Sequence, residues 1–271
     1  MANIIAIYNF KGGVGKTSTT LSLAHSLSRA YKVLVIDCDP QCNLSQSLLE
    51  DKSPKDGQNL YHLTSKFLHN SIPEISPVSI HSYLDLIPGD FKMSMLESNS
   101  QFISFGQTIT YSLLSTLRSK YDLILLDFPT HFGMTVKSFI ANIDSILIPA
   151  IPDSFSNSGF KQLLTYLAEI EKDKPIDILG IFFNQYRKNT LYHRNIVKKA
   201  EKELGELILK QKIRESVRVS EAHQFSKSIY TVTEESNVAE DFLKLSEEVI
   251  GRLNTYDVNM ALEKINDKER V

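Results

Sequence analysis

The sequence predicts a doubly wound α/β fold, in which a mostly parallel sheet carries helices on both faces. Two observations lead to this fold class. Apolar runs of strand length alternate with helical patterns as far as about residue 254. One junction between a strand and a helix contains a glycine-rich turn of the kind that surrounds phosphate groups. We therefore expect a single domain over residues 1–254 and a polar C-terminal tail over residues 255–271.

The first strand and the first helix enclose that glycine-rich turn. Ile4–Tyr8 is a short apolar run, and Ser18–Ala30 carries apolar residues at helical spacing. Between them, residues 11–17 read Lys-Gly-Gly-Val-Gly-Lys-Thr. Glycines let the backbone approach phosphates closely, while Lys16 would reach the β- and γ-phosphates and the Thr17 hydroxyl would bind Mg²⁺. The usual phosphate loop has glycine where this chain has Phe10, and the lysine that follows makes the loop a deviant form.

The remaining elements follow in the same alternation. We expect further strands at residues 32–36, 83–87, 121–127, 145–148 and 176–183, and a surface loop at 51–59. Helices are expected near residues 60–69, 106–119, 157–172, 190–204 and 238–254. The strand at 121–127 is apolar on both faces, which is typical of a central parallel strand.

Three carboxylates stand at strand ends that point toward the phosphate loop. Asp127 ends an apolar strand, the usual place for a carboxylate that holds Mg²⁺ through water. Asp37 and Asp39 end the neighbouring strand, and one of them would polarise the attacking water. Asp37 has a second interpretation, in which it only caps the following turn.

Composition narrows the class of protein. The chain has 271 residues, of which 42% are hydrophobic and 23% charged, which is ordinary for a soluble protein. We expect no signal peptide and no transmembrane segment, since no apolar run approaches ~18 residues. Cys38 and Cys42 lie too close together for a disulfide scaffold, which favours a reducing cytoplasm. Positions 185–230 contain eleven basic and five acidic residues, which gives this segment a net charge of +6 in a chain whose net charge is −2. Such a local excess suits binding to the DNA backbone.

Several motifs together resemble the ParA/MinD group of deviant Walker ATPases. They are the loop at 11–17, Asp-Cys-Asp-Pro-Gln at 37–41 and Leu-Asp-Phe-Pro at 126–129. The stretches at 148–149, 159–164, 217–222 and 225–227 resemble the ParA/Soj branch in particular. The resemblance runs from about residue 3 to 252. It implies a P-loop NTPase fold, ATP and Mg²⁺ as cofactors, and a homodimer that forms with ATP.

The resemblance also implies roles for individual residues. Lys11 is the signature lysine that crosses the ATP-sandwich dimer to the partner's γ-phosphate, and Asp39 is the catalytic aspartate. Lys11, Lys16 and Asp39 thus form the expected catalytic set. The nucleotide would be bound by Lys11, Gly12, Gly13, Val14, Gly15, Lys16, Thr17 and Ser18, with Asn184 near the adenine. The expected metal-binding residues are Thr17, Asp39 and Asp127.

By the same resemblance, the chain is a partition ATPase that moves plasmid or chromosomal DNA. Its dimer would bind double-stranded DNA without sequence preference, and a ParB-like centromere-binding partner would stimulate hydrolysis. The expected location is the cytoplasm, in association with the nucleoid, and no membrane partner is expected. The candidate DNA-binding residues are Lys198, Lys199, Lys202, Arg218 and Lys227.

Two other functions stay open, and the chain departs from the family in three places. A ParA-like positioner of a protein cargo would have the same motifs. A MinD-like membrane regulator is disfavoured by the highly charged stretch at 260–270. Relatives usually have two prolines after the residue that follows Asp127, whereas this chain has Pro129-Thr130-His131. His131 would be either close to the γ-phosphate or a structural or solvated histidine. Arg214 and His223 also replace prolines, so we expect the wall around the adenine and the DNA-facing loop to differ from those of relatives.

Overall fold

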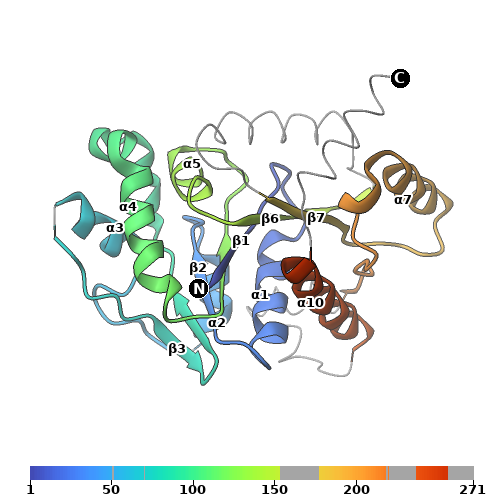
Figure 1. Cartoon of the computed structure of the whole chain (residues 1–271), viewed down its shortest axis with the longest axis horizontal. Coiled ribbons are helices and arrows are strands. Elements are labelled where there is room, and N and C mark those ends of the chain that lie inside the picture. Colours follow the sequence, from blue (N-terminus) through green and yellow to red (C-terminus); the bar gives the residue numbers. More distant parts are fainter. Residues whose placement is uncertain (51, 70, 153–176, 218, 220–235, 256–271) are drawn as a thin grey trace.

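A seven-stranded sheet forms the centre of the computed structural model, which describes residues 1–50, 52–69, 71–152, 177–217, 219 and 236–255 (Figure 1). The strands are β1 (Asn3–Ile7), β2 (Val33–Asp37), β3 (Val78–His81), β4 (Leu84–Ile87), β5 (Leu123–Asp127), β6 (Ser145–Ala150) and β7 (Asp177–Phe183). Their order in the sheet is β3-β4-β2-β5-β1-β6-β7, and β3 alone runs antiparallel to its neighbour. The predicted mostly parallel sheet is confirmed.

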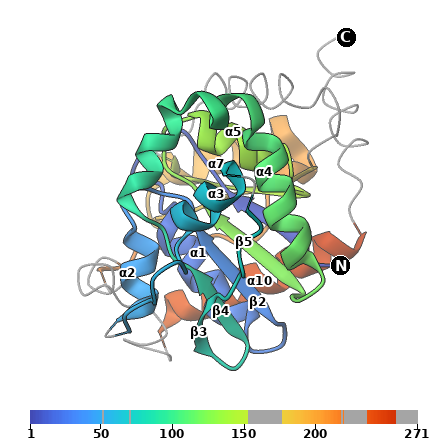
Figure 2. The same cartoon turned by 90° about the vertical axis from the view of Figure 1, so that its left-hand side faces the viewer.

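Helices cover both faces of this sheet. They are α1 (Lys16–Leu27), α2 (Asn43–Leu49), α3 (Leu60–Leu68), α4 (Ser100–Arg118), α5 (Met134–Ile140), α7 (Leu191–Leu204) and α10 (Asn237–Thr255), with 3₁₀ turns η1 (Phe91–Ser98) and η3 (Gly205–Leu207). Successive strand residues point to opposite faces. Ile4 and Ala6 accordingly belong to one core with α3, α4, α5 and α7, whereas Ile5 and Ile7 belong to the other with α1, α2 and α10. The doubly wound arrangement is visible in Figures 1 and 2.

Element boundaries differ from the sequence predictions where a cap decides them. The helix expected from residue 106 begins at Ser100, because the Asn99 side chain accepts a hydrogen bond from the Phe102 backbone N–H at 2.9 Å. The elements α2, α5, β3 and η1 were not predicted from the sequence. Each is short, and β3 has four residues of alternating partial exposure. The helix expected at 157–172 and nearly all of the tail at 255–271 lie outside the described residues.

Cationic side chains bind backbone carbonyl groups at the outer strands and, beside β7, at the segment around Ile208 that pairs with it. Lys52 Nζ donates to the carbonyls of Ser79 and Ile80, at 2.9 and 2.7 Å, on the β3 side. On the β7 side, Arg252 donates to the carbonyls of Leu179 and Ile208, at 2.9 and 3.2 Å. Both edges of the sheet are therefore partly occupied.

The sheet brings the carboxyl ends of three central strands together. Ile7 of β1 and Asp37 of β2 both pair in register with Asp127 of β5. The turn after β1 therefore lies beside the carboxylates that end β2 and β5. In the part of the chain that the structure describes, no helix is long and apolar enough to cross a bilayer.

Candidate nucleotide-binding site

The loop between β1 and α1 has the backbone conformation of a phosphate cradle. Gly13 and Gly15 adopt positive φ angles of 73° and 86°, a region that glycine enters without a steric cost. Gly15 is also the N-cap of α1 and has no side chain to occupy the first free N–H groups of that helix. These groups and the positive helix end are available to an anion.

Three side chains outside the loop hold it in place. Asn9 Nδ2 donates to the Pro149 carbonyl at 2.8 Å, and Asn9 Oδ1 accepts from the Lys11 N–H at 3.0 Å. From the end of β7, Asn184 donates to the Val14 carbonyl and Gln185 to the Gly13 carbonyl, both at 2.9 Å. Asn184 thus lies against the loop. Gln185 was not predicted, since nothing in the local sequence marks a glutamine with a positive φ as a loop contact.

The two lysines of the loop differ in burial. Lys16 is buried, and its ammonium group lies 3.4 Å from the Lys11 carbonyl oxygen. Burial lowers the pKa of Lys16, while the nearby charges of Asp127 and Asp39 oppose that shift. The Lys11 side chain is half-buried at the start of the loop. Lys16 is therefore the buried lysine of the loop, and Lys11 is the more exposed one.

Asp127 is joined to α1 through hydroxyl groups. Thr17 Oγ1 donates to Asp127 Oδ2 at 2.8 Å, and Thr20 Oγ1 donates to Oδ1 at 3.1 Å. Asp127 is fully buried, and this burial together with the Asp37 charge raises its pKa to about 8. A hydroxyl and a carboxylate at this distance are hard oxygen donors of the kind that Mg²⁺ prefers. The side chains present therefore fit a magnesium ion bound together with phosphate.

Asp37 and Asp39 have different environments. Asp37 is fully buried and accepts hydrogen bonds from the Asp39 N–H, the Ser45 N–H and the Ser45 hydroxyl, at 3.1, 2.8 and 2.6 Å. Burial raises the pKa of Asp37 to about 6. Asp39 is half-buried and accepts from the Gln41 N–H at 2.8 Å. The geometry favours the interpretation in which Asp37 caps the turn, and it leaves Asp39 as the more accessible carboxylate.

Aromatic rings surround the residue that replaces the first loop glycine. The Phe10 ring lies 5.3 Å from that of Tyr8 and 5.6 Å from that of Phe132, both in edge-on contacts. This packing, which the sequence analysis did not foresee, joins the loop to the segment after Asp127. His131 in that segment is exposed, which favours the solvated alternative.

The expected DNA-binding residues are only partly described. Lys198, Lys199 and Lys202 are exposed on α7, whereas Arg218 and Lys227 lie outside the described residues. Some basic residues of the 185–230 segment are in ion pairs, and these pairs are Arg187–Glu215, Lys199–Glu203, Lys212–Glu201 and Arg214–Asp241. Three of these pairs join residues that the net charge of +6 already balances, so only the pair with Asp241, outside the segment, lowers its net positive charge.

Among the described residues, no group of three or more histidine, cysteine or acidic side chains is arranged to hold a metal ion. Mg²⁺ at nucleotide sites usually has one or two protein oxygen ligands besides phosphate oxygens and water. The cysteines Cys38 and Cys42 are free thiols, the first buried and the second half-buried.

The sheet order, the glycine loop before α1 and the position of Asp127 define a P-loop NTPase fold. The sequence model of a family described as an AAA domain matches residues 2–179. A ParA family protein of Chlamydia muridarum is 31% identical over 253 residues, which cover 91% of this chain and 96% of that protein. The sporulation initiation inhibitor protein Soj of Bacillus subtilis is 28% identical, over 92% of this chain and 98% of its own length. The chain belongs to the ParA family.

A solved structure shares the fold. The plasmid partition protein of Borrelia burgdorferi bound to AMPPNP has a TM-score of 0.76 and 22% sequence identity, and the match covers 93% of this chain and 98% of that one. At this identity the likeness concerns the fold alone.

Proposed function

We propose that this chain is an ATP-dependent partition protein that binds and hydrolyses ATP with Mg²⁺ at the loop after β1. The observation that carries the proposal is the loop itself: the buried Lys16 ammonium lies 3.4 Å from the Lys11 carbonyl oxygen, and the Thr17 hydroxyl lies 2.8 Å from the Asp127 carboxylate. The AMPPNP-bound partition protein of the same fold supports ATP as the nucleotide. Residues 1–254 would act as one ATPase domain.

Each site residue has a distinct part in the proposed reaction. The loop N–H groups and Lys16 bind the phosphate chain, and Ser18 lies in the first turn of α1 next to Thr17. Thr17 and Asp127 would hold Mg²⁺ with Asp39 nearby, and the ion supplies neutralisation of the charge that develops on the phosphates. Asp39, the accessible carboxylate after β2, orients the attacking water. Phosphoryl transfer of this kind depends mainly on positioning and charge neutralisation.

Lys11 has a different role, in a homodimer that forms around ATP. Lys16 is buried within the loop, so the half-buried Lys11 at the start of the loop would be the lysine that reaches a phosphate held by a second copy. The dimer binds double-stranded DNA without sequence preference through basic residues that include those on α7. A ParB-like centromere-binding protein stimulates hydrolysis, and the dimer then releases DNA in the cytoplasm.

Sedimentation of the wild-type chain with ATP, with ADP and without nucleotide tests this function. We expect a dimer with ATP only. Lys11→Ala should bind ATP and stay monomeric, whereas Lys16→Ala should lose ATP binding altogether. Lys120→Ala is the matched control, since Lys120 is exposed just before β5, at the opposite end of that strand from Asp127.

Two outcomes would contradict the proposal. A Lys11→Ala protein that dimerises like the wild type would exclude the sandwich arrangement. A wild-type chain that does not bind ATP would exclude the ATPase function.

A further inference from the structure

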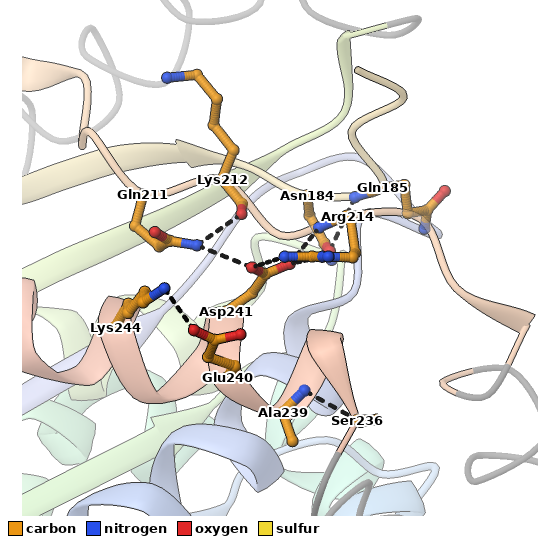
Figure 3. A network of polar contacts seen from close by, with 10 residues as sticks. All are labelled: Asn184, Gln185, Gln211, Lys212, Arg214, Ser236, Ala239, Glu240, Asp241 and Lys244. Atoms are coloured by element: carbon orange, nitrogen blue, oxygen red, sulfur yellow. Dashed lines mark hydrogen bonds and ion pairs between the residues drawn. The ribbon is translucent and has the colours of Figure 1, made fainter. Parts of the chain in front are cut away.

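Arg214 lies next to the strand end that contacts the phosphate loop. The segment around it runs alongside the end of β7, because the Ile213 N–H donates to the Phe183 carbonyl and the Tyr186 N–H donates to the Ile213 carbonyl, both at 2.9 Å. Arg214 is thereby paired with Tyr186. Figure 3 shows Arg214 beside Asn184 and Gln185, the residues that donate to the loop carbonyls.

One edge of the Arg214 guanidinium is fixed by α10. Arg214 Nε and Nη2 donate to the two carboxylate oxygens of Asp241 at 2.6 and 2.8 Å, and the Arg214 backbone N–H donates to Asp241 at 3.1 Å. Gln211 also donates to this carboxylate, at 3.3 Å (Figure 3). The Asp241 side chain is 6% exposed, whereas that of Arg214 is 47% exposed. The guanidinium plane is therefore held in one orientation while much of its surface stays accessible.

The site geometry gives the nucleotide a direction. Asp39 and Asp127 lie on the β2 and β5 side of the loop, which is where the terminal phosphate and its metal ion belong. Asn184 and Gln185 contact the loop from the opposite side, that of β7. The sugar and the base must leave the phosphate chain away from the carboxylates, and hence toward the end of β7 and Arg214.

We propose that the Arg214 guanidinium is a stacking platform for the purine base of the nucleotide. The inference rests on the proposed nucleotide binding at the loop. Guanidinium planes stack on nucleobases and aromatic rings, and stacking of this type does not need hydrogen bonds to the base edge. Asp241 engages two of the five N–H donors of Arg214 and fixes the guanidinium plane, and the 47% exposed side chain leaves a flat face accessible to a base.

The ion pair between Arg214 and Asp241 has no net charge, which favours stacking on a base over binding of a phosphate. Asp241 neutralises Arg214 within a bidentate ion pair, which reduces the attraction of the guanidinium for a phosphate. Arg214 should consequently contribute to affinity for the base and hardly at all to affinity for the phosphate chain.

Competition against a fluorescent ATP analogue tests this platform. The competitors are ATP, CTP and tripolyphosphate, each with Mg²⁺. We expect Arg214→Ala to lower affinity for ATP about tenfold and to narrow the ratio between ATP and CTP, because stacking is stronger for the larger ring. Affinity for tripolyphosphate should stay within about twofold of the wild-type value, by the same reasoning.

Matched variants separate stacking from folding. Arg187→Ala removes another bidentate pair, with Glu215 of the same segment at 2.6 and 2.7 Å, and should leave all three affinities unchanged. Arg214→Gln with Asp241→Asn keeps a polar pair in place without an unpaired buried carboxylate. This double variant should fold with the wild-type melting temperature and still lose the ATP preference.

The outcomes are distinct. An unchanged ratio between ATP and CTP in both Arg214 variants would overturn the platform, and so would an equal loss of affinity for ATP and tripolyphosphate, which would indicate a purely structural ion pair. A wild-type chain that binds none of the competitors would instead contradict the proposed function.

Discussion

At the scale of a single residue, burial of Asp127 favours the protonated carboxyl group, whereas the proposed Mg²⁺ binding requires the carboxylate. It is fully buried, and its raised pKa of about 8 means that the folded, nucleotide-free chain retains a proton that the unfolded chain releases. The free energy of unfolding should therefore fall as the pH rises between the pKa values of the unfolded and the folded chain. The stabilising effect of this protonation is complete below about pH 4, the ordinary pKa of an aspartate, and it is lost as the pH rises to about 8.

Asp127→Asn should therefore stabilise the nucleotide-free chain at pH 8 while weakening Mg²⁺-dependent ATP binding. Removing a buried charge should be worth roughly 1–3 kcal/mol at pH 8, or several degrees in melting temperature, and the gain should vanish near pH 4. Thermal unfolding at the two pH values, together with ATP titrations with and without Mg²⁺, measures both effects.

Asp39→Asn is the control for this prediction. Asp39 is half-buried and is expected to orient water, so its substitution should leave thermal stability and Mg²⁺-dependent binding unchanged and slow only hydrolysis. If the two variants showed the same defect, the proposed division of roles between the carboxylates would be wrong.

Residues within a local motif could be predicted, and residues that act across the chain could not. The roles proposed for Lys16, Thr17 and Asp127 follow from the loop and the strand end in which these residues occur. Ser45, by contrast, binds Asp37 from eight residues away, and Gln185 contacts the loop from another strand. Nothing in the local sequence encodes such contacts, since they depend on how the elements pack.

At the scale of elements, α7 presents a basic surface opposite its buried face. Val197, Ala200 and Leu204 pack into the core. Lys198 and Lys202 are four residues apart on the exposed side, so they lie one above the other. Like charges placed in this way repel each other and gain from a bound polyanion.

Lys198→Ala combined with Lys202→Ala should weaken binding to every duplex tested, without a change in sequence preference or ATP affinity. In a two-fold dimer this variant removes four phosphate contacts. The slope of log K against log salt should therefore fall by up to about 3.6, at about 0.9 for each contact. Fluorescence anisotropy over a salt series, with ATP present, measures it. The control combines Lys66→Ala with Lys120→Ala, two exposed lysines of other elements. An unchanged slope would remove α7 from the DNA-binding surface.

The N-cap residue and the length of a helix explain why some helices could be predicted from the sequence and others could not. The helices α3 and α4 have asparagine N-caps that bind backbone N–H groups, and both were anticipated. The helices α2 and α5 have seven residues each and N-caps without a side-chain hydrogen bond. Periodicity over two turns is too short to distinguish a helix from a loop, because such helices are stabilised mainly by packing. Glu97 illustrates this, since it accepts hydrogen bonds from the N–H groups of Met134 and Thr135 at the start of α5.

At the scale of the whole molecule, the tendency of the sheet to associate with other chains depends on how its edge strands are covered. The doubly wound topology could be predicted because strands and helices alternate along the sequence. The antiparallel edge strand β3 could not, since it is short and half-exposed. Unpaired edge strands are templates for association with other chains. The Lys52 contacts counteract this tendency at β3, whereas at β7 the segment around Leu209 and Ile213 and the Arg252 side chain cover the edge.

Arg252→Leu should leave the carbonyls of Leu179 and Ile208 without this donor, at a cost of roughly 1–3 kcal/mol. We also expect faster aggregation on warming. Urea unfolding and light scattering measure the two effects. Lys244→Leu serves as the control on the same helix, because the ion pair of Lys244 with Glu240 is on the surface, where such pairs contribute little. Equal behaviour of the two variants would show that the edge contact is dispensable.

The phosphate loop is fastened to its surroundings through Asn9, Asn184 and Gln185. When a binding site is already ordered, little conformational entropy is lost on binding, so little of the binding free energy is spent on ordering the chain. We expect most of the free energy gained from the triphosphate to remain available for joining two copies. On this expectation, ATP joins the two copies through the contacts that it makes with both, rather than by changing the conformation of either. Its hydrolysis would remove these contacts and let the copies dissociate.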